Sequence, residues 1–184
     1  MLDELFDSLK VKMTKVIDHY LKEMTTIRTG RASTSLLDSI KVDYYGTLSP
    51  INNIAHVSTP DSQNILVQPF DPSSLEAIEK AIISSDIGLN PNNDGNMIRL
   101  TIPALTDERR GELVKLVHKY IEDGRIAIRN IRREGNDTLK KNQKEHHISD
   151  DDLKKELDNV QEMTDEYIAK LNEMQNNKEQ EILN

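Results

Sequence analysis

The stretch that decides the fold is "LDELFDSLKVKMTKVIDHYLKEMTTIR", residues 2–28. Its apolar positions recur at intervals of three and four residues: Leu2, Phe6, Leu9, Met13, Val16, Tyr20, Met24 and Ile27. This spacing predicts one amphipathic helix with a single apolar stripe over about seven turns. We expect Gly30 to end the helix at a C-cap position. One stripe cannot bury itself, so the fold requires partner helices from elsewhere in the chain.

Two later segments supply those partners. From residue 105 to about residue 145, one face of a predicted helix carries Leu113, Val117, Ile121, Ile128, Ile131 and Leu139. In "ISDDDL", Ser149 and Asp152 are spaced for helix capping and predict the start of a last helix. Its apolar face carries Leu153, Leu157, Val160, Met163, Tyr167, Leu171, Met174 and Ile182. Three such stripes can bury one another, so we predict a three-helix bundle built from residues 1–30 and 105–184.

The segment between the first two helices has strand patterns. In "SIKVDYYG" apolar and polar residues alternate, and "INNIAHV", "NILVQPF" and "MIRLTIP" are further strand candidates. "SSLEAIEKAII" predicts a short helix, with Ser73 and Glu76 spaced as a capping box. "IGLNPNNDGN" has the composition of a loop. Residues 31–104 therefore predict a small α+β domain inserted into the bundle.

The chain must cross between the two predicted domains twice. The first crossing contains Gly30, Arg31 and Ala32, and the second contains Pro103, Ala104 and Leu105. Glycine and small residues favour flexibility at the first crossing, and proline restrains the second. Two crossings permit bending about an axis, so we predict a hinge at these residues.

Charge is distributed unevenly along the chain, whose formal net charge is −8. Residues 105–148 hold eleven basic and eight acidic side chains, whereas residues 149–184 hold four basic and eleven acidic ones. The basic character concentrates in "RIAIRNIRR", residues 125–133. At about 100° per residue, Arg125, Arg129, Arg132 and Arg133 lie within one arc of the helix, beside the apolar face.

Two interpretations of these arginines remain open from the residues alone. They could pair with the acidic last helix, although each surface pair contributes only about 0–1 kcal/mol. Alternatively they could bind phosphate, for which the guanidinium fork is well suited. Gly124 and Gly135 favour a close approach on this helix, either by a ligand or by a neighbouring helix.

The sequence argues against several other classes of protein. Cysteine is absent, which excludes disulfides and Cys-ligated metals, and the scattered histidines predict no metal site. No nucleotide-binding glycine loop or nucleophile motif occurs, so we expect neither a cofactor, a small-molecule substrate nor enzymatic activity. No long apolar run or targeting peptide is evident, which predicts a cytoplasmic protein without membrane contact.

Four motifs together resemble the ribosome recycling factor family, in order and at the family's spacing. They are "IRTGRAS" at 27–33, "VDYYGTLSP" at 42–50, "GLNPNNDGNMIRLTIPALTDERR" at 88–110 and "RNIRREGND" at 129–137. The resemblance implies an elongated, L-shaped, two-domain monomer: an antiparallel three-helix bundle with an inserted β/α/β domain on a hinge.

The resemblance also implies a function and a site. Members of the family bind the post-termination ribosome and, with elongation factor G and GTP, split it into subunits, releasing mRNA and deacylated tRNA. The bundle binds large-subunit rRNA, and the matching positions are Arg110, Arg129 and Arg132. Arg125 and Arg133 share the same arc, and Arg28 and Arg31 match the motif beside the hinge. A helical scaffold that binds partner proteins is the alternative reading.

Overall fold

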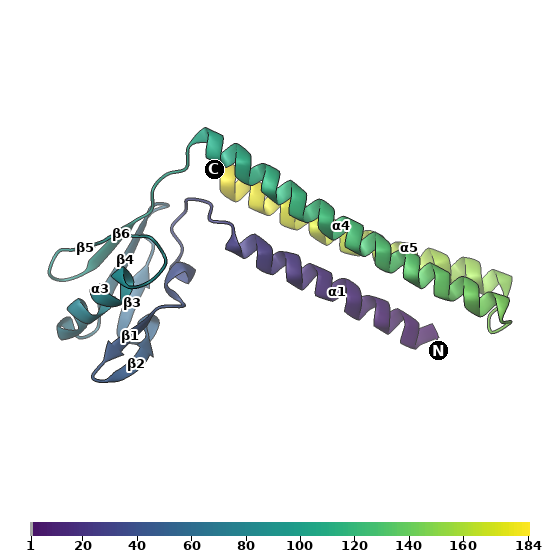
Figure 1. The fold of residues 1–184 in the computed structure, drawn as a ribbon, viewed down its shortest axis with the longest axis horizontal. Coiled ribbons are helices and arrows are strands. Elements are labelled where there is room, and N and C mark those ends of the chain that lie inside the picture. The colour runs from purple at the N-terminus through teal and green to yellow at the C-terminus, as the bar shows by residue number, and fades with distance from the viewer. Residues whose placement is uncertain (1) are drawn as a thin grey trace. The chain divides into compact units, whose positions relative to one another are not determined.

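The computed structural model describes residues 2–184, which divide into two compact units. Residues up to Thr29 together with Asp107–Asn184 form a helical unit, and Gly30–Thr106 form a unit with strands and short helices (Figure 1). The helical unit contains α1 (Leu2–Thr26), α4 (Asp107–Lys144) and α5 (Asp150–Leu183). The three helices expected from the apolar stripes are therefore confirmed.

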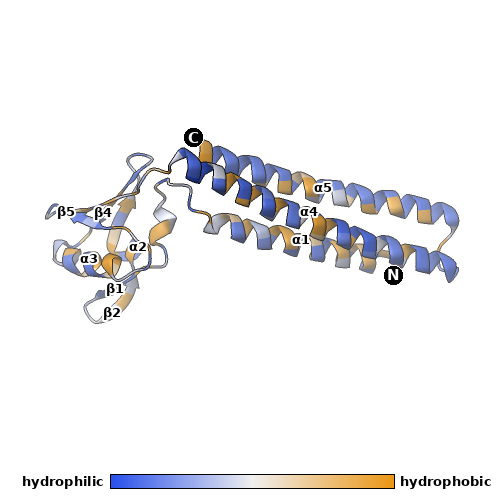
Figure 2. Ribbon diagram, turned by 45° about the horizontal axis from the view of Figure 1, so that its top comes forward, coloured by the Kyte–Doolittle hydropathy of each residue, from blue (hydrophilic) through white to orange (hydrophobic). Residues whose placement is uncertain are grey.

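The helical unit is a bundle in which α4 contacts both other helices. Its core consists of the predicted stripes, and the fully buried members include Leu9, Met13, Val117, Ile121, Ile128, Leu139, Val160 and Leu171. Apolar residues recur along each helix and hydrophilic residues fill the remaining positions (Figure 2). The Ser149 hydroxyl accepts a hydrogen bond from the Asp152 backbone N–H, and the Asp152 carboxylate accepts one from Ser149 N–H. The predicted capping box at the start of α5 is thus confirmed.

The prediction that Gly30 caps the first helix is wrong. The helix α1 ends at Thr26, four residues earlier, and Gly30 serves a different purpose. Its φ of 72° lies in the left-handed region, and a Cβ there would stand 2.8 Å from Leu105 Cγ. Glycine is therefore required where the two connecting segments approach each other.

The second unit combines two antiparallel sheets with one main helix. Strands β1 (Lys41–Tyr44) and β2 (Thr47–Pro50) form a hairpin. The strands β3 (Ala55–Ser58), β4 (Asn64–Pro69), β5 (Pro91–Asn93) and β6 (Ile98–Thr101) form a sheet of order β3-β4-β6-β5. The helix α3 (Leu75–Ile83) buries Leu75, Ile78 and Ile82 in the common core with Val42, Ile65, Val67, Ile98 and Leu100.

Three local predictions in this unit fail. Residues Ile51–Ile54 form a helical turn, α2, rather than the start of a strand, and both terminal isoleucines are buried. The backbone N–H of Ser73 donates a hydrogen bond to the Asp71 side chain, which caps a 3₁₀ turn (Pro72–Ser74) ahead of α3. Ser73 and Glu76 therefore do not form the predicted capping box. Strand β5 lies inside the segment expected to be a loop, where pairing with β6 supplies its hydrogen bonds.

Both chain crossings are tied to the second unit by hydrogen bonds. The N–H of Ala32 donates to Ser62 O at 2.7 Å, and the N–H of Ile102 donates to Gln63 O at 2.7 Å. Ala32 also packs against the core of that unit. Of the expected hinge residues, Ala32 therefore belongs to the body of the small domain.

Two of the three glycines within α4, Gly124 and Gly135, allow close packing of helices. A Cβ on Gly135 would lie 2.7 Å from Leu9 Cδ1 of α1, and a Cβ on Gly124 would lie 3.1 Å from Tyr20 Cδ2 and 3.2 Å from Leu171 Cδ1. Both glycines are buried. The close approach that the sequence left open is thus made by neighbouring helices.

We predict that Gly135→Leu lowers the free energy of unfolding by about 1–3 kcal/mol, because the new side chain overpacks the α1–α4 contact. The matched control is Gly111→Leu, also in α4, where no atom lies within 4 Å of an added Cβ. That change removes a helix glycine and should stabilise by up to about 1 kcal/mol. Urea unfolding followed by circular dichroism measures both, and equal effects would contradict the packing role of Gly135.

Candidate nucleic-acid interface

The arginines of residues 125–133 lie beside the buried face of α4. Gly124, Ile128 and Gly135 point into the bundle, and the arginines occupy the neighbouring positions on the helix surface. All four come from one rigid helix, so their backbone positions are fixed relative to one another. Their side chains, however, differ in the partners they have.

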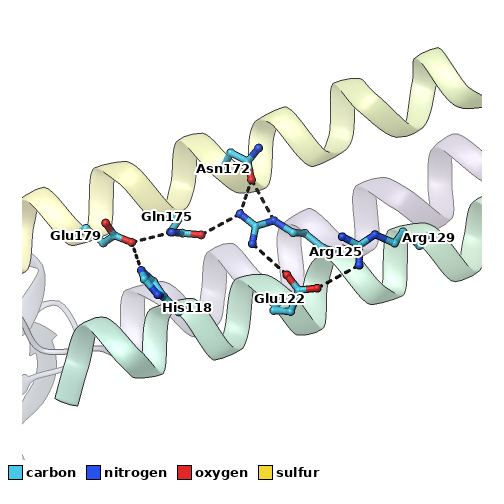
Figure 3. Close-up of polar contacts among 7 residues, drawn as sticks. All are labelled: His118, Glu122, Arg125, Arg129, Asn172, Gln175 and Glu179. Carbon is cyan, nitrogen blue, oxygen red and sulfur yellow. Dashed lines mark hydrogen bonds and ion pairs between the residues drawn. The ribbon is translucent and has the colours of Figure 1, made fainter. Parts of the chain in front are cut away.

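Arg125 joins α4 to α5. Its Nε and Nη2 donate to Asn172 Oδ1 at 3.1 and 2.6 Å, and Nη2 also donates to Gln175 Oε1 at 3.0 Å. Its Nη1 donates to Glu122 Oε2 at 3.1 Å, and the side chain is 24% exposed. These four hydrogen bonds engage most of the five N–H groups of the guanidinium. Arg125 is therefore chiefly a structural link between helices (Figure 3).

Arg129 shares the acid that Arg125 uses. Its Nη1 donates to Glu122 Oε1 at 3.1 Å, and its side chain is 41% exposed. Hydrogen bonds from Arg125 and then from Arg129 hold the pKa of the Glu122 carboxyl below its ordinary range. Because this pKa is lowered on folding, the pairing stabilises the fold at neutral pH and is lost as the pH falls through the lowered pKa. One carboxylate thus serves two guanidinium groups.

Arg132 and Arg133 have fewer partners than Arg125. The Nη1 of Arg132 donates to Gln161 Oε1 of α5 at 3.0 Å. The Nη1 of Arg133 approaches Asn130 Oδ1 of its own helix at 3.5 Å, at the limit for a hydrogen bond, and Arg133 is exposed. Most donors of both side chains remain available for an external acceptor.

The remaining candidate arginines lie away from this group. Arg110, near the start of α4, points to the end of α5, where Nη1 lies 3.4 Å from Leu183 O. Its Nε is buried and has no hydrogen-bond partner among the described residues. Arg28 and Arg31 are exposed, and they belong to different units because the division falls between Thr29 and Gly30. Arg129, Arg132 and Arg133 share one arc of α4 with Arg125, and we call these three residues the cationic surface of α4.

Of the two interpretations left open, pairing of these arginines with acidic side chains of the last helix is not what the structure shows. Within residues 2–184, the ion pairs of the four arginines all end on Glu122, which belongs to α4 itself. The α5 side chains that accept from them are amides: Gln161, Asn172 and Gln175. Arg125 and Arg132 contact α5 through neutral amides, and the ion pairs of Arg125 and Arg129 are both made with Glu122.

Sequence reasoning missed Glu122 and the three amides. Glu122 precedes Arg125 by three residues and Arg129 by seven, a spacing that places it on the same helix face. Gln161, Asn172 and Gln175 are separated by eleven and three residues, which also places them on one face of α5. The spacing within each helix could be taken from the sequence. Which face of α5 lies against the arginines of α4 could be learned only from the structure.

The described residues show neither a metal cluster nor a membrane span. In residues 2–184 no three His, Cys, Asp or Glu side chains gather as metal ligands. No described helix combines the length and apolar character needed to cross a membrane.

The fold and these arginines define a class: a three-helix-bundle protein with a group of arginines on one helix and an inserted sheet domain. A family model described as ribosome recycling factor matches residues 20–183. The chain belongs to the ribosome recycling factor family.

Relatives and solved structures agree over the whole chain. The ribosome-recycling factors of Bacillus cytotoxicus and Halothermothrix orenii are 49% and 50% identical over 183 residues, covering 100% of this chain and 99% of theirs. A solution structure of ribosome recycling factor has a TM-score of 0.77 at 41% identity, covering 99% of this chain and 97% of that one. A second structure shows T. thermophilus ribosome recycling factor and E. coli elongation factor G bound to the E. coli post-termination complex. It has a TM-score of 0.66 at 47% identity and covers both chains fully.

Proposed function

We propose that this protein recycles ribosomes after termination. It binds the post-termination ribosome and, with elongation factor G and GTP, splits it into subunits so that mRNA and deacylated tRNA are released. Family membership supports the reaction. The solved structure of a 47% identical relative with elongation factor G on the post-termination complex supports the partners. The protein works as a monomer in the cytoplasm and is a translation factor without enzymatic activity.

The contact with the ribosome is made through the cationic surface of α4. Arg129, Arg132 and Arg133 bind the phosphates of large-subunit rRNA, because they share one arc of α4 and each makes a single hydrogen bond within residues 2–184. Arg125 links this surface to α5, and Arg110, Arg28 and Arg31 extend the contact. Phosphate contacts of this kind fix position and orientation without reading sequence. The acidic remainder of the protein is repelled by RNA, which disfavours other orientations.

We predict that Arg132→Ala weakens binding to purified large ribosomal subunits roughly tenfold, because one charge-assisted contact with phosphate is lost. The slope of log affinity against log salt should also become less negative by about 0.9. Sedimentation over a salt series measures both quantities. The melting temperature should change little, since Arg132 makes one exposed hydrogen bond.

Lys170→Ala provides the control for charge. Lys170 lies over the Tyr167 ring, at the groove between α1 and α5, so this variant removes one positive charge elsewhere on the bundle. Its binding should match that of wild type. Equal affinities and salt slopes for Arg132→Ala and wild type would refute an rRNA contact at α4.

Splitting requires movement in addition to binding. We propose that the hinge comprises Gly30 and Arg31 in one crossing and Pro103, Ala104 and Leu105 in the other. Its limits are the hydrogen bonds of Ala32 and Ile102 to the small domain. A movable joint lets elongation factor G displace one domain while the bundle holds the large subunit.

We predict that Gly30→Ala impairs subunit splitting more than subunit binding. Alanine is strained at a φ of 72°, and its Cβ would meet Leu105. Light scattering of post-termination ribosomes with elongation factor G and GTP measures splitting. Gly46→Ala is the control, because Gly46 also has a positive φ, of 81°, but lies in the β1–β2 turn with open space around it. An equal loss of binding and splitting for Gly30→Ala would contradict the hinge.

A further inference from the structure

The last helix is the most acidic part of the chain, yet it presents neutral side chains to the arginines. Residues 149–184 contain eleven acidic and four basic side chains. Opposite Arg125 and Arg132, however, the α5 acceptors are the carboxamides of Asn172, Gln175 and Gln161. We call these three residues the amide row.

Each glutamine of the amide row has partners of opposite character at its two ends. The Gln161 carbonyl accepts from Arg132, while its Nε2 donates to Asp165 Oδ1 at 2.8 Å. The Gln175 carbonyl accepts from Arg125, while its Nε2 donates to Glu179 Oε1 at 2.8 Å. Figure 3 shows this second chain, which runs from Arg125 through Gln175 and Glu179 to His118. The amides therefore separate the arginines from the α5 carboxylates.

This arrangement holds an arginine in place without cancelling its charge. A carbonyl of an amide accepts a hydrogen bond as a carboxylate does, but it carries no net charge. A carboxylate at the same distance would offset much of the attraction between the guanidinium and an incoming phosphate. Glu122 already does this for Arg125 and Arg129, which leaves Arg132 and Arg133 without an ion pair among the described residues.

We propose that Gln161, Asn172 and Gln175 are positioning residues of the anion-binding surface, and that Gln161 leaves the charge of Arg132 uncancelled because its amide is neutral. They orient Arg125 and Arg132 from α5 while keeping the surface positive for the RNA backbone. This inference rests on the proposed contact between α4 and large-subunit rRNA. It assigns to α5 a part in binding that needs no direct contact with RNA.

The test is Gln161→Glu, which keeps the shape and the acceptor and adds one negative charge beside Arg132. We expect affinity for purified large ribosomal subunits to fall about fivefold and the salt slope to become less negative by about 0.9. The melting temperature should stay close to that of wild type. A new ion pair with Arg132 and a new repulsion with Asp165 are of similar size on a helix surface.

Two further variants separate charge from position. Asn177→Asp adds the same charge to α5 at an exposed site about 160° around the helix from Gln161, and it should bind as wild type. Gln161→Met removes the acceptor without adding charge and should cost at most about twofold. A loss in Gln161→Met as large as in Gln161→Glu would overturn the role of neutrality.

Binding by Arg132→Ala distinguishes a failure of the amide-row proposal from a failure of the proposed rRNA contact at α4. If Arg132→Ala weakens binding and Gln161→Glu binds as wild type, the amide row is unimportant and the rRNA contact stands. If neither variant weakens binding, the contact at α4 itself is wrong, and the amide row falls with it.

Discussion

The packing of α1 against the α4–α5 pair is the constraint on which the rest of the structure depends. The chain leaves the bundle after α1, builds the small domain and returns as α4, so no short loop holds α1 in place. Burial of its apolar stripe must do so, and Gly124 and Gly135 allow Tyr20 and Leu9 to approach α4 closely. This packing fixes which face of α4 is buried. The arginines at the neighbouring positions are thereby directed along the α4–α5 seam and outward.

The function of this surface depends on arginine side chains that are held in fixed positions by their hydrogen-bond partners. One acid, Glu122, pairs with Arg125 and Arg129, and Gln161 of the amide row holds Arg132 without neutralising it. Two of the nearby α5 carboxylates, Asp165 and Glu179, accept hydrogen bonds from the side-chain amides of Gln161 and Gln175. An acidic protein can in this way carry one cationic face, which suits a factor that must bind RNA in a single orientation.

The long helices and their bundle were easier to predict from the sequence than individual turns and helix ends. Stripes that repeat over seven or more turns predicted three helices and a bundle, because tertiary burial dominates helix formation. The Ser149–Asp152 capping box was also predictable, since both partners lie within one turn. The position of Gly30 was misread, because its positive φ serves an approach to Leu105, a residue 75 positions away. Burial of both isoleucines accompanies the helical turn at Ile51–Ile54, and the Asp71 side chain binds the N–H of Ser73. Neither contact was predictable from the local sequence pattern.

The arc of arginines was predictable from helix geometry, whereas the difference in the number of hydrogen bonds that each arginine makes was not. Arg125 and Arg133 differ by eight residues on one helix, yet Arg125 makes four hydrogen bonds and Arg133 makes one long one. That difference depends on which α5 side chains stand opposite, and only the packed bundle determines them. Composition suggested acidic partners for the arginines, and the structure provides amides.

Arginine modification by phenylglyoxal, read by mass spectrometry with and without large ribosomal subunits, tests the central claim most directly. We predict that Arg129, Arg132 and Arg133 react in the free protein and are protected in the complex, whereas Arg125 reacts little in either state. Equal reactivity of Arg129, Arg132 and Arg133 in the free and bound protein would contradict it.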